Sequence, residues 1–293
     1  MPKVESWQLW QRQKMPLDIK IRYSEERIRS WYDHFGGCVY VSFSGGKDSV
    51  VLLHLVRKLY PNVVGVFVDT GLEYPEIRKF VKDTDNIVWL RPARSFSQVL
   101  EKFGYPVISK DVSQKVYEIR NTKSDKLRNK RLYGDDKGYG KLSNKWRFLV
   151  DAEFKISHDC CRIMKKNPCK KFERESGLRP FIGTMACNSA NRTTTYLRTG
   201  CNSFESSRPL SVPISFWLEE DIWEYIRKYE LKYSEIYDTG IKNTGCMYYM
   251  FGIHMEAEPN RFQRMKNTHP KQYDYCIDKL GCGKVLDFLD IKY

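Results

Sequence analysis

The segment CVYVSFSGGKDSVVLLHLV, residues 38–56, decides the fold of this chain. Its first six residues form a short apolar run typical of a β-strand, and residues 50–56 have the apolar periodicity of a helix. The polar stretch Ser44–Ser49 joins the two. Gly45 and Gly46 permit a tight turn that brings backbone N–H groups against an anion, and the N-terminus of the following helix favours the same negative charge. The segment therefore predicts a phosphate-binding loop.

The remaining side chains of this loop suit a nucleotide. Ser44 and Ser49 can donate from their hydroxyls, and Lys47 supplies a point charge. Asp48 would be repelled by bare phosphate, so we assign it to Mg²⁺ or to helix capping. The spacing is not that of a Walker A loop, which has four residues between its first glycine and Gly-Lys. A glycine turn that merely starts a helix is the alternative, and the agreement of strand, loop and helix favours the phosphate site.

Apolar runs and helical patterns alternate along much of the chain. Strand-like runs recur at residues 63–68, 87–90 and 180–183, and helical patterns at residues 5–31, 77–81 and 219–226. Continuous apolar strands alternating with helices indicate an α/β fold, a parallel sheet flanked by helices. Ligands of such folds bind at the carboxyl ends of the strands, which is where Ser44–Ser49 and Asp69–Glu73 fall. We expect an N-terminal helical segment at 1–36, a nucleotide-binding domain at 37–218 and a small C-terminal subdomain at 219–293.

The chain is basic, with a net charge of +14 and a pI near 9.2 over 293 residues, which favours polyanionic partners such as DNA or RNA. Residues 121–147 hold nine Lys or Arg against three Asp, and we interpret them as a flexible basic insertion. The nucleic-acid candidates within it are Lys126, Arg128, Lys130 and Arg131. The sequence contains neither a long apolar run nor a secretory signal pattern, so we expect a cytoplasmic protein without a membrane span.

Four motifs resemble one family. Residues 42–49 resemble the PP-loop of the ATP pyrophosphatase superfamily, and Asp69–Glu76 resembles the second motif of its phosphoadenosine phosphosulfate (PAPS) reductase branch. Residues 213–223 and 236–240 are similar to the C-terminal half of that branch. The resemblance implies an adenine nucleotide α-hydrolase sheet that binds ATP with Mg²⁺. The nucleotide-binding residues it implies are Ser42, Ser44, Gly45, Gly46, Lys47, Asp48, Ser49, Asp69, Thr70, Gly183 and Arg192.

The nine cysteines are expected to be free thiols or metal ligands. Many members of the family carry an iron–sulfur cluster on a Cys-Cys pair and a later Cys-x-x-Cys. Here the matching ligands are Cys160, Cys161 and Cys246, whereas Tyr249 stands where the fourth cysteine is expected. Three readings stay open: a cluster completed by Cys201 or Cys169, inert thiols, or a cysteine that carries sulfur.

The resemblance leaves three functions. The leading one is an enzyme that cleaves ATP to AMP and pyrophosphate and adenylates an acceptor in sulfur transfer or nucleic-acid modification, with Lys47, Asp48 and Cys161 as catalytic residues. Gly46-Lys47-Asp48 is intact, as in relatives that cleave ATP, whereas reductases usually alter it. The second is a sulfonucleotide reductase, although residues 280–283 lack the glutamate of the reductase Glu-Cys-Gly segment. The third is a silent component that binds nucleotide or nucleic acid in a complex, with a partner protein or as a homo-oligomer.

Overall fold

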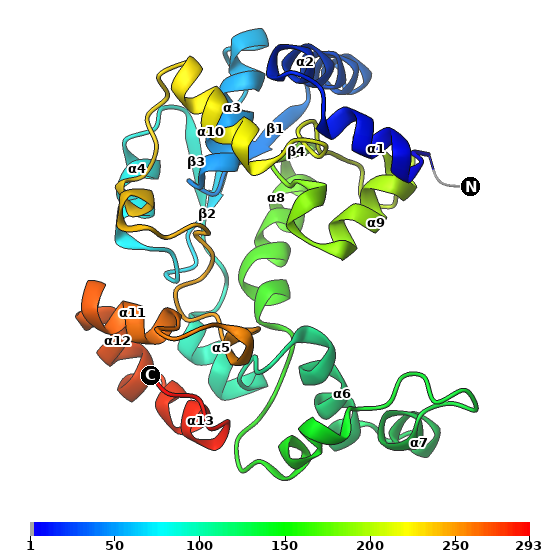
Figure 1. Cartoon of the computed structure of the whole chain (residues 1–293), viewed down its shortest axis with the longest axis vertical. Helices are drawn as coiled ribbons and strands as arrows, with labels where there is room; N and C mark the ends of the chain where they lie inside the picture. The colour runs from blue at the N-terminus through cyan, green and yellow to red at the C-terminus, as the bar shows by residue number, and fades with distance from the viewer. Residues whose placement is uncertain (1–2) are drawn as a thin grey trace. The chain divides into compact units, whose positions relative to one another are not determined.

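The computed structural model describes residues 3–293 and divides the chain into two compact units, which are described separately (Figure 1). The sheet unit comprises Met1–Asp69, Tyr74–Leu90 and Cys169–Thr244. The second unit comprises Thr70–Glu73, Arg91–Pro168 and Gly245–Tyr293. Each unit is assembled from segments that are far apart in the sequence. The predicted domains at 1–36, 37–218 and 219–293 are consecutive segments, so they divide the chain differently, and they stay a prediction.

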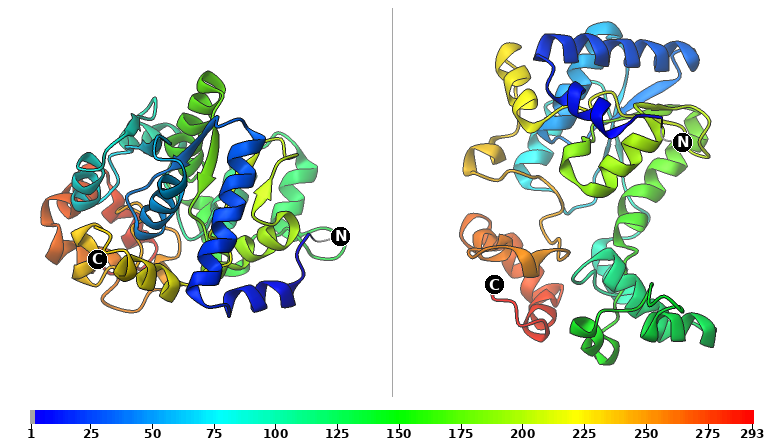
Figure 2. Two further views of the ribbon diagram at one scale, coloured as in Figure 1. Left: turned by 90° about the horizontal axis from the view of Figure 1, so that it is seen from above. Right: turned by 45° about the vertical axis from the view of Figure 1, so that its right-hand side comes forward.

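A six-stranded sheet forms the centre of the sheet unit (Figure 2, left). Its order is β3-β2-β1-β4-β6-β5, and all neighbouring strands are parallel except β5 and β6. The strands are β1 (Val39–Ser42), β2 (Gly65–Val68), β3 (Ile87–Leu90), β4 (Arg179–Ile182), β5 (Asn202–Ser203) and β6 (Leu210–Ser211). The predicted α/β fold with a parallel sheet flanked by helices is therefore confirmed.

The central strands are buried and the edge strand is not. Val39, Tyr40 and Val41 of β1 are at most 3% exposed, as their continuous apolar sequence predicts. In β3, by contrast, Val88 and Trp89 are more than a third exposed. This exposure accompanies the position of β3 at the edge of the sheet, where it has a neighbouring strand on one side only.

Within residues 3–293, seven α-helices accompany the sheet: α1 (Ser6–Gln13), α2 (Leu17–His34), α3 (Lys47–Leu59), α4 (Pro75–Lys82), α8 (Asn167–Ser176), α9 (Ala190–Thr199) and α10 (Glu219–Lys228). The helical pattern at residues 5–31 is two helices rather than one, because Pro16 cannot continue α1 and instead precedes the first turn of α2. A buried ion pair joins two of these helices, with Lys20 Nζ of α2 at 2.5 Å from Asp221 Oδ2 of α10.

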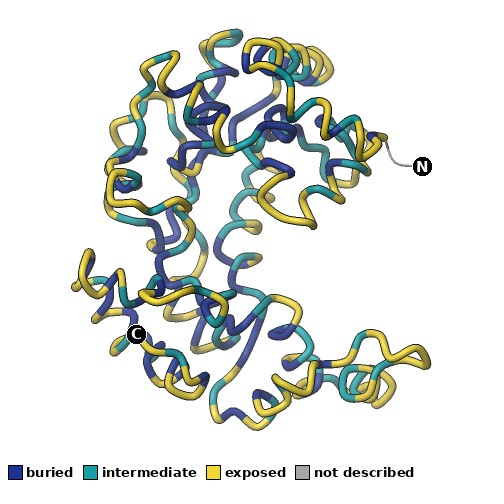
Figure 3. Tube along the Cα trace, viewed as in Figure 1, coloured by how far each residue is buried: buried dark blue, intermediate teal, exposed yellow. Residues whose placement is uncertain are grey.

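The second unit contains α5 (Phe96–Phe103), α6 (Lys110–Asn121), α7 (Asp125–Tyr133), α11 (Arg261–Thr268), α12 (Pro270–Asp274) and α13 (Cys282–Phe288). The basic insertion predicted at 121–147 is partly helical, and its flexibility stays a prediction. The Ser124 hydroxyl caps α7, Leu142 is fully buried, and a 3₁₀ helix follows at Asn144–Asp151. Figure 3 shows α7 and the loop after it as mostly exposed. None of the helices in the described part of the chain combines the length and apolar character that a membrane crossing requires.

Candidate functional site

The loop Ser44–Ser49 lies at a branch point of the sheet. From β1 the chain passes through α3 to β2 on one side, whereas β4 lies on the other side of β1. Ligands of open α/β sheets bind where the strand order reverses in this way, outside the carboxyl ends of the strands. The end of β1, with Ser42 as its last residue, is such a place, and the loop leads directly into the N-terminus of α3.

Hydrogen bonds within the loop fix its shape. Ser49 Oγ accepts from Ser44 N at 3.1 Å and donates to the Gly46 carbonyl at 2.8 Å, while Ser44 Oγ accepts from Gly46 N at 3.3 Å. The two serines therefore order the backbone through which phosphate oxygens would be bound. Their hydroxyls also contact each other at 3.1 Å.

Three glycines are required by close packing at the loop. Gly45 has a φ of +73°, and a Cβ there would lie 2.6 Å from Val81 of α4. A Cβ on Gly46 would lie 2.9 Å from Thr244 Oγ1. A Cβ on Gly183, which follows β4, would lie 3.1 Å from the carbonyl oxygen of Asp48. The structure thus brings Gly183 against the loop, as the prediction for this residue requires.

Lys47 is the first residue of α3 and is only 4% exposed. Its backbone N–H donates to the hydroxyl of Tyr237 at 2.9 Å, and its Nζ donates to the Lys242 carbonyl at 3.4 Å. Nζ also lies 3.3 Å from Asp48 Oδ1 and 3.6 Å from Glu219 Oε1. Burial alone would lower the pKa of Lys47, but Asp48, Tyr237 and Glu219 raise it above its usual value. The lysine is therefore held as a buried cation.

The Asp48 carboxylate is partly buried beside Lys47. Its Oδ1 is buried, and the Lys47 ammonium 3.3 Å away is the cation that faces it. Burial raises the pKa of Asp48, and Lys47 and Arg192 oppose that shift. Arg192 lies on α9, so the structure places this predicted residue within electrostatic range of the loop.

Mg²⁺ in nucleotide sites is held by one or two carboxylates together with phosphate oxygens. Asp48 and Glu219 offer two carboxylates around Lys47, so the residues present fit such an ion. Within residues 3–293, no group of three or more His, Cys, Asp or Glu side chains has an arrangement that could hold a metal by itself. The nucleotide phosphates would thus have to complete the shell.

The second predicted loop begins at the end of β2. Asp69 is buried and accepts from the Arg78 guanidinium at 2.8 Å. Thr70 belongs to the second unit, where its N–H and its hydroxyl both donate to the Glu73 carboxylate, at 3.0 and 2.7 Å. These bonds define the conformation of both residues, and their role in nucleotide binding stays a prediction.

The second unit brings Cys246 together with the adjacent Cys160 and Cys161, which precede it by more than 80 positions in the sequence. The three cysteines line one apolar pocket with Tyr248 and Tyr249, so Tyr249 lies beside the thiols as its sequence position suggests. The pocket leaves about 10 Å³, room for one water molecule at most.

The residues that line this cysteine pocket do not fit a four-iron cluster. Clusters of that kind are bound by four thiolates, and here a tyrosine occupies the fourth place. Of the two cysteines considered as substitutes, Cys201 is buried in the sheet unit, with its sulfur 3.6 Å from Ser215 Oγ. Cys169 is also part of the sheet unit, on α8.

A lysine accompanies these cysteines. Lys165 Nζ lies 3.3 Å from Glu73 Oε1. Burial would lower the pKa of Lys165, but the neighbouring Cys246 and Glu73 raise it. Burial raises the pKa of Cys246, and the Lys165 charge opposes that shift. Burial also raises the pKa of Cys160.

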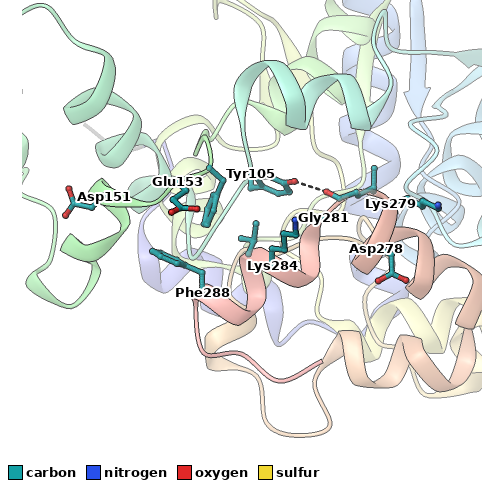
Figure 4. A pocket seen from close by; sticks show the side chains of 11 residues that line it. Tyr105, Asp151, Glu153, Asp278, Lys279, Gly281, Lys284 and Phe288 are labelled. Atoms are coloured by element: carbon teal, nitrogen blue, oxygen red, sulfur yellow. Dashed lines mark hydrogen bonds between the residues drawn. The ribbon is translucent and has the colours of Figure 1, made fainter.

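A separate open pocket of about 740 Å³ lies in the second unit (Figure 4). The Tyr105 hydroxyl at its rim donates to the Leu280 carbonyl at 2.8 Å. Acidic and basic side chains share its lining, and none of the predicted site residues belongs to it. The residues that line it are Tyr105, Asp151, Glu153, Phe154, Asp278, Lys279, Leu280, Gly281, Lys284, Val285 and Phe288.

Sequence reasoning missed several residues around the phosphate loop. Tyr237, the Lys242 carbonyl and Glu219 all contact Lys47, although none was assigned a role. Tyr237 belongs to the stretch 236–240 that had been matched as a motif, so a signal for it existed. Glu219 is the first of three acidic residues in the first turn of α10, a pattern that fits the helix dipole and gives no sign of a contact with Lys47.

The sheet order and the loop after β1 are those of an α/β protein of the PP-loop type. Residues 38–130 and 109–250 match the family described as the phosphoadenosine phosphosulfate reductase domain. The chain belongs to this family, as its motifs predicted.

Several known proteins are similar to the chain. An uncharacterised protein of Methanocaldococcus jannaschii is 27% identical over 84% of this chain, which spans only 42% of that relative's length. The adenosine 5′-phosphosulfate reductase of Lysinibacillus sphaericus is 23% identical over 78% of this chain and 81% of its own. Among solved structures, phosphoadenylyl-sulfate reductase from Candida auris, in a phosphate complex, aligns with a TM-score of 0.46 at 16% identity, over 84% of this chain and 98% of its own.

Proposed function

We propose that the chain binds ATP at Ser44–Ser49 and cleaves it between the α and β phosphates, adenylating an acceptor and releasing pyrophosphate. One observation carries the proposal: the intact Gly46-Lys47-Asp48 core begins α3 with a buried lysine cation whose Nζ lies 3.3 Å from a buried oxygen of the Asp48 carboxylate. A leaving pyrophosphate needs a cation where its charge develops, and a fixed buried cation serves that need without reorganisation.

Different residues of the loop would bind the phosphates and stabilise the leaving pyrophosphate. The amides from Gly45 to Lys47 and the hydroxyls of Ser44 and Ser49 would bind phosphate oxygens at the positive end of α3. The Tyr237 hydroxyl and the Lys242 carbonyl currently accept from Lys47, so phosphate oxygens would replace them as acceptors. Lys47 would then stabilise the leaving pyrophosphate. Gly183, Arg192 and Asp69, all in the sheet unit, would border the same nucleotide. The role of Thr70 in nucleotide binding stays a prediction.

Asp48 and Glu219 would hold Mg²⁺ together with the nucleotide phosphates. The ion supplies charge neutralisation between phosphate oxygens when it is bound. Asp48 suits the role because carboxylate oxygens are the protein ligands that Mg²⁺ takes beside phosphate oxygens, and its Oδ1 is held at the start of α3 by the Lys47 ammonium 3.3 Å away.

Cys161 is the proposed sulfur-handling residue. It is half-exposed, whereas Cys160 is buried, and Cys246 and Lys165 belong to the same site. We derive no step through an iron–sulfur cluster, because only three thiols line this pocket.

Sulfonucleotide reduction is the second candidate, and the adenosine 5′-phosphosulfate reductases among the relatives favour it. One feature disfavours it. Cys282, the cysteine in the segment comparable to the reductase Glu-Cys-Gly, is fully buried at the start of α13. A thiol that attacks a sulfonucleotide must reach it, and this one is packed in the core of the second unit.

A nucleotide titration separates the candidates. We expect the protein to bind ATP·Mg²⁺ more tightly than adenylyl-sulfate or PAPS, and to release pyrophosphate when an acceptor and a sulfur donor are present. Tight PAPS binding with sulfite release and indifference to ATP would favour the reductase instead. ATP binding without pyrophosphate release for any acceptor would favour the silent binding component.

A further inference from the structure

In residues 121–147, hereafter the basic arm, some of the basic side chains form ion pairs with acidic side chains of the protein itself. Arg131 Nε lies 2.5 Å from Glu118 Oε2, Arg128 lies 3.3 Å from Asp125, and Lys130 lies 3.3 Å from Asp135. Arg128 also donates to the Thr122 carbonyl at 2.9 Å. Three of the four predicted nucleic-acid residues are therefore occupied by contacts inside the arm or with α6.

The arm has further cations that these contacts do not use. Five of its lysines are exposed and form no ion pair within the described residues: Lys123, Lys126, Lys137, Lys141 and Lys145. Asp136 is the one acid of the arm outside these ion pairs, so the five lysines are in excess and repel one another, and a polyanion relieves that cost. Lys126 is the one member of the predicted set that belongs to this group.

Two aromatic side chains lie among these lysines with most of their surface in solvent. Tyr133, the last residue of α7, is 67% exposed, and Tyr139 in the following loop is 70% exposed. The loop is ordered by reciprocal bonds, with Asp135 N donating to the Tyr139 carbonyl and Tyr139 N to Asp135 Oδ1, both at 2.9 Å. Leu142 N then donates to the Arg131 carbonyl at 2.7 Å, which returns the chain to α7. Figure 1 shows this loop beside α7.

We propose that the basic arm binds an unpaired stretch of nucleic acid, whose bases stack on Tyr133 and Tyr139 and whose phosphates pair with the free lysines. The inference deepens the proposed function and rests on it, because it names a nucleic acid as the acceptor. Alternating cations and exposed aromatic rings suit single strands, since every base has a face that can stack. A protein partner is disfavoured because α7 contains no buried residue and only Leu127, Leu132 and Tyr133 as large apolar side chains.

Binding can be measured without ATP by fluorescence anisotropy, with a labelled mixed-sequence single-stranded RNA, the DNA of the same sequence, and the corresponding duplex. We expect Tyr133→Ala and Tyr139→Ala each to weaken single-strand binding about fivefold or more, the lower range for the loss of one stacked base. Tyr139→Phe should bind like the wild type because it keeps the ring. Binding of either the RNA or the DNA supports the proposal, and the tighter of the two identifies the sugar.

The lysines are tested by salt dependence. The variant Lys126→Gln/Lys137→Gln/Lys141→Gln should lower the log–log salt slope by about 0.7 for each phosphate contact removed. The matched control is Lys3→Gln/Lys82→Gln/Lys232→Gln, which removes the same charge from exposed positions of the sheet unit. All six lysines are exposed, so both triple variants should fold like the wild type. Circular dichroism spectra of the two variants and the wild type check this.

Equal losses in the two triple variants, or unchanged binding by both tyrosine variants, would overturn the proposal. So would a duplex that binds as tightly as the single strand, since paired bases cannot stack on tyrosines. Failure here is distinct from failure of the proposed function. If the arm variants release pyrophosphate as fast as the wild type, the proposal of ATP cleavage is still supported. If the protein binds single strands but releases no pyrophosphate, the proposal for the arm is still supported.

Discussion

The phenolic oxygen of Tyr237 accepts a hydrogen bond from the backbone nitrogen of Lys47 at 2.9 Å. Lys47 begins α3, so its N–H is one of the helix amides that have no partner within the helix. Tyr237 comes 190 positions later, in the 3₁₀ helix Glu235–Thr239, and its hydroxyl also lies 3.0 Å from Thr244 Oγ1. The Tyr237 hydroxyl thus occupies the position where a phosphate oxygen would be expected to accept the hydrogen bond of the Lys47 N–H.

This contact predicts an effect of removing one oxygen atom. Tyr237→Phe should tighten ATP binding by about two- to tenfold, because the phosphate no longer competes for a hydrogen bond of ordinary strength. Isothermal titration calorimetry measures the change. Tyr233→Phe is the control, since the Tyr233 hydroxyl contacts Asp238 and not the loop. Weaker binding by Tyr237→Phe would mean that the hydroxyl supports the nucleotide site instead.

Lys47→Ala should impair catalysis more than binding. The charge matters most when pyrophosphate leaves, so we expect a loss of about a hundredfold in the rate of pyrophosphate release and a much smaller change in ATP affinity. Lys58→Ala, a change at an exposed position of the same helix, should leave both quantities unaltered. Equal losses in affinity and rate would assign Lys47 to ground-state binding.

Asp48 should make both Mg²⁺ binding and stability depend on pH. Burial raises its pKa, so protonation begins at a higher pH than for an ordinary aspartate, and Mg²⁺-dependent activity should fall as the pH drops through that raised value. A raised carboxyl pKa means that the folded state binds the proton more tightly than the unfolded state. The Asp48 contribution to stability therefore declines as the pH rises from the unfolded pKa to the folded one.

Asp48→Asn tests both effects. The variant should need more Mg²⁺ for pyrophosphate release, and it should lose this part of the pH dependence of stability. Mg²⁺ titrations and urea unfolding from mildly acidic to neutral pH measure the two quantities. An unchanged Mg²⁺ requirement would remove Asp48 from the ion site.

Protein purified without oxygen should contain well under one equivalent of a four-iron cluster, because the pocket offers three thiols. Tyr249→Cys should raise the iron and sulfide content, since it replaces a bulky ring in that pocket with a fourth thiol. Tyr275→Cys, which adds a thiol outside the pocket, is the control. Stoichiometric iron in the wild type, lost in Cys161→Ser, would contradict the prediction.

The ion pair of Lys20 with Asp221 predicts a stability effect. Lys20 is 2% exposed, and Asp221 also accepts from Leu218 N at 2.7 Å at the start of α10. Lys20→Ala should lower the free energy of unfolding by about 3–5 kcal/mol because it leaves a buried carboxylate without its cation. Lys58→Ala, which breaks the more exposed contact with Glu25, should cost at most about 1 kcal/mol. Urea denaturation of both variants measures the difference, and equal effects would contradict the argument.

The local pattern was sufficient for the elements near the phosphate loop. The strand of residues 87–90 has the predicted bounds, and β1 and α10 begin and end within two residues of the predicted ones. The patterns were incomplete where a chain-breaking residue or tertiary packing intervened. Pro16 divides the N-terminal helix, and the basic arm contains α7, capped by Ser124, and the buried Leu142.

The sequence by itself determined the α/β fold, the phosphate loop and the family, because each depends on residues that are neighbours along the chain or on quoted motifs. It also showed Tyr249 at the position where the family motif has its fourth cysteine. Only the tertiary structure decided that Tyr237 and Glu219 contact Lys47, and that Cys246 joins Cys160 and Cys161 in one pocket. Contacts of this kind join segments that are remote in sequence. Hydrophobic periodicity specifies which face of an element is buried and not which distant side chain meets it there.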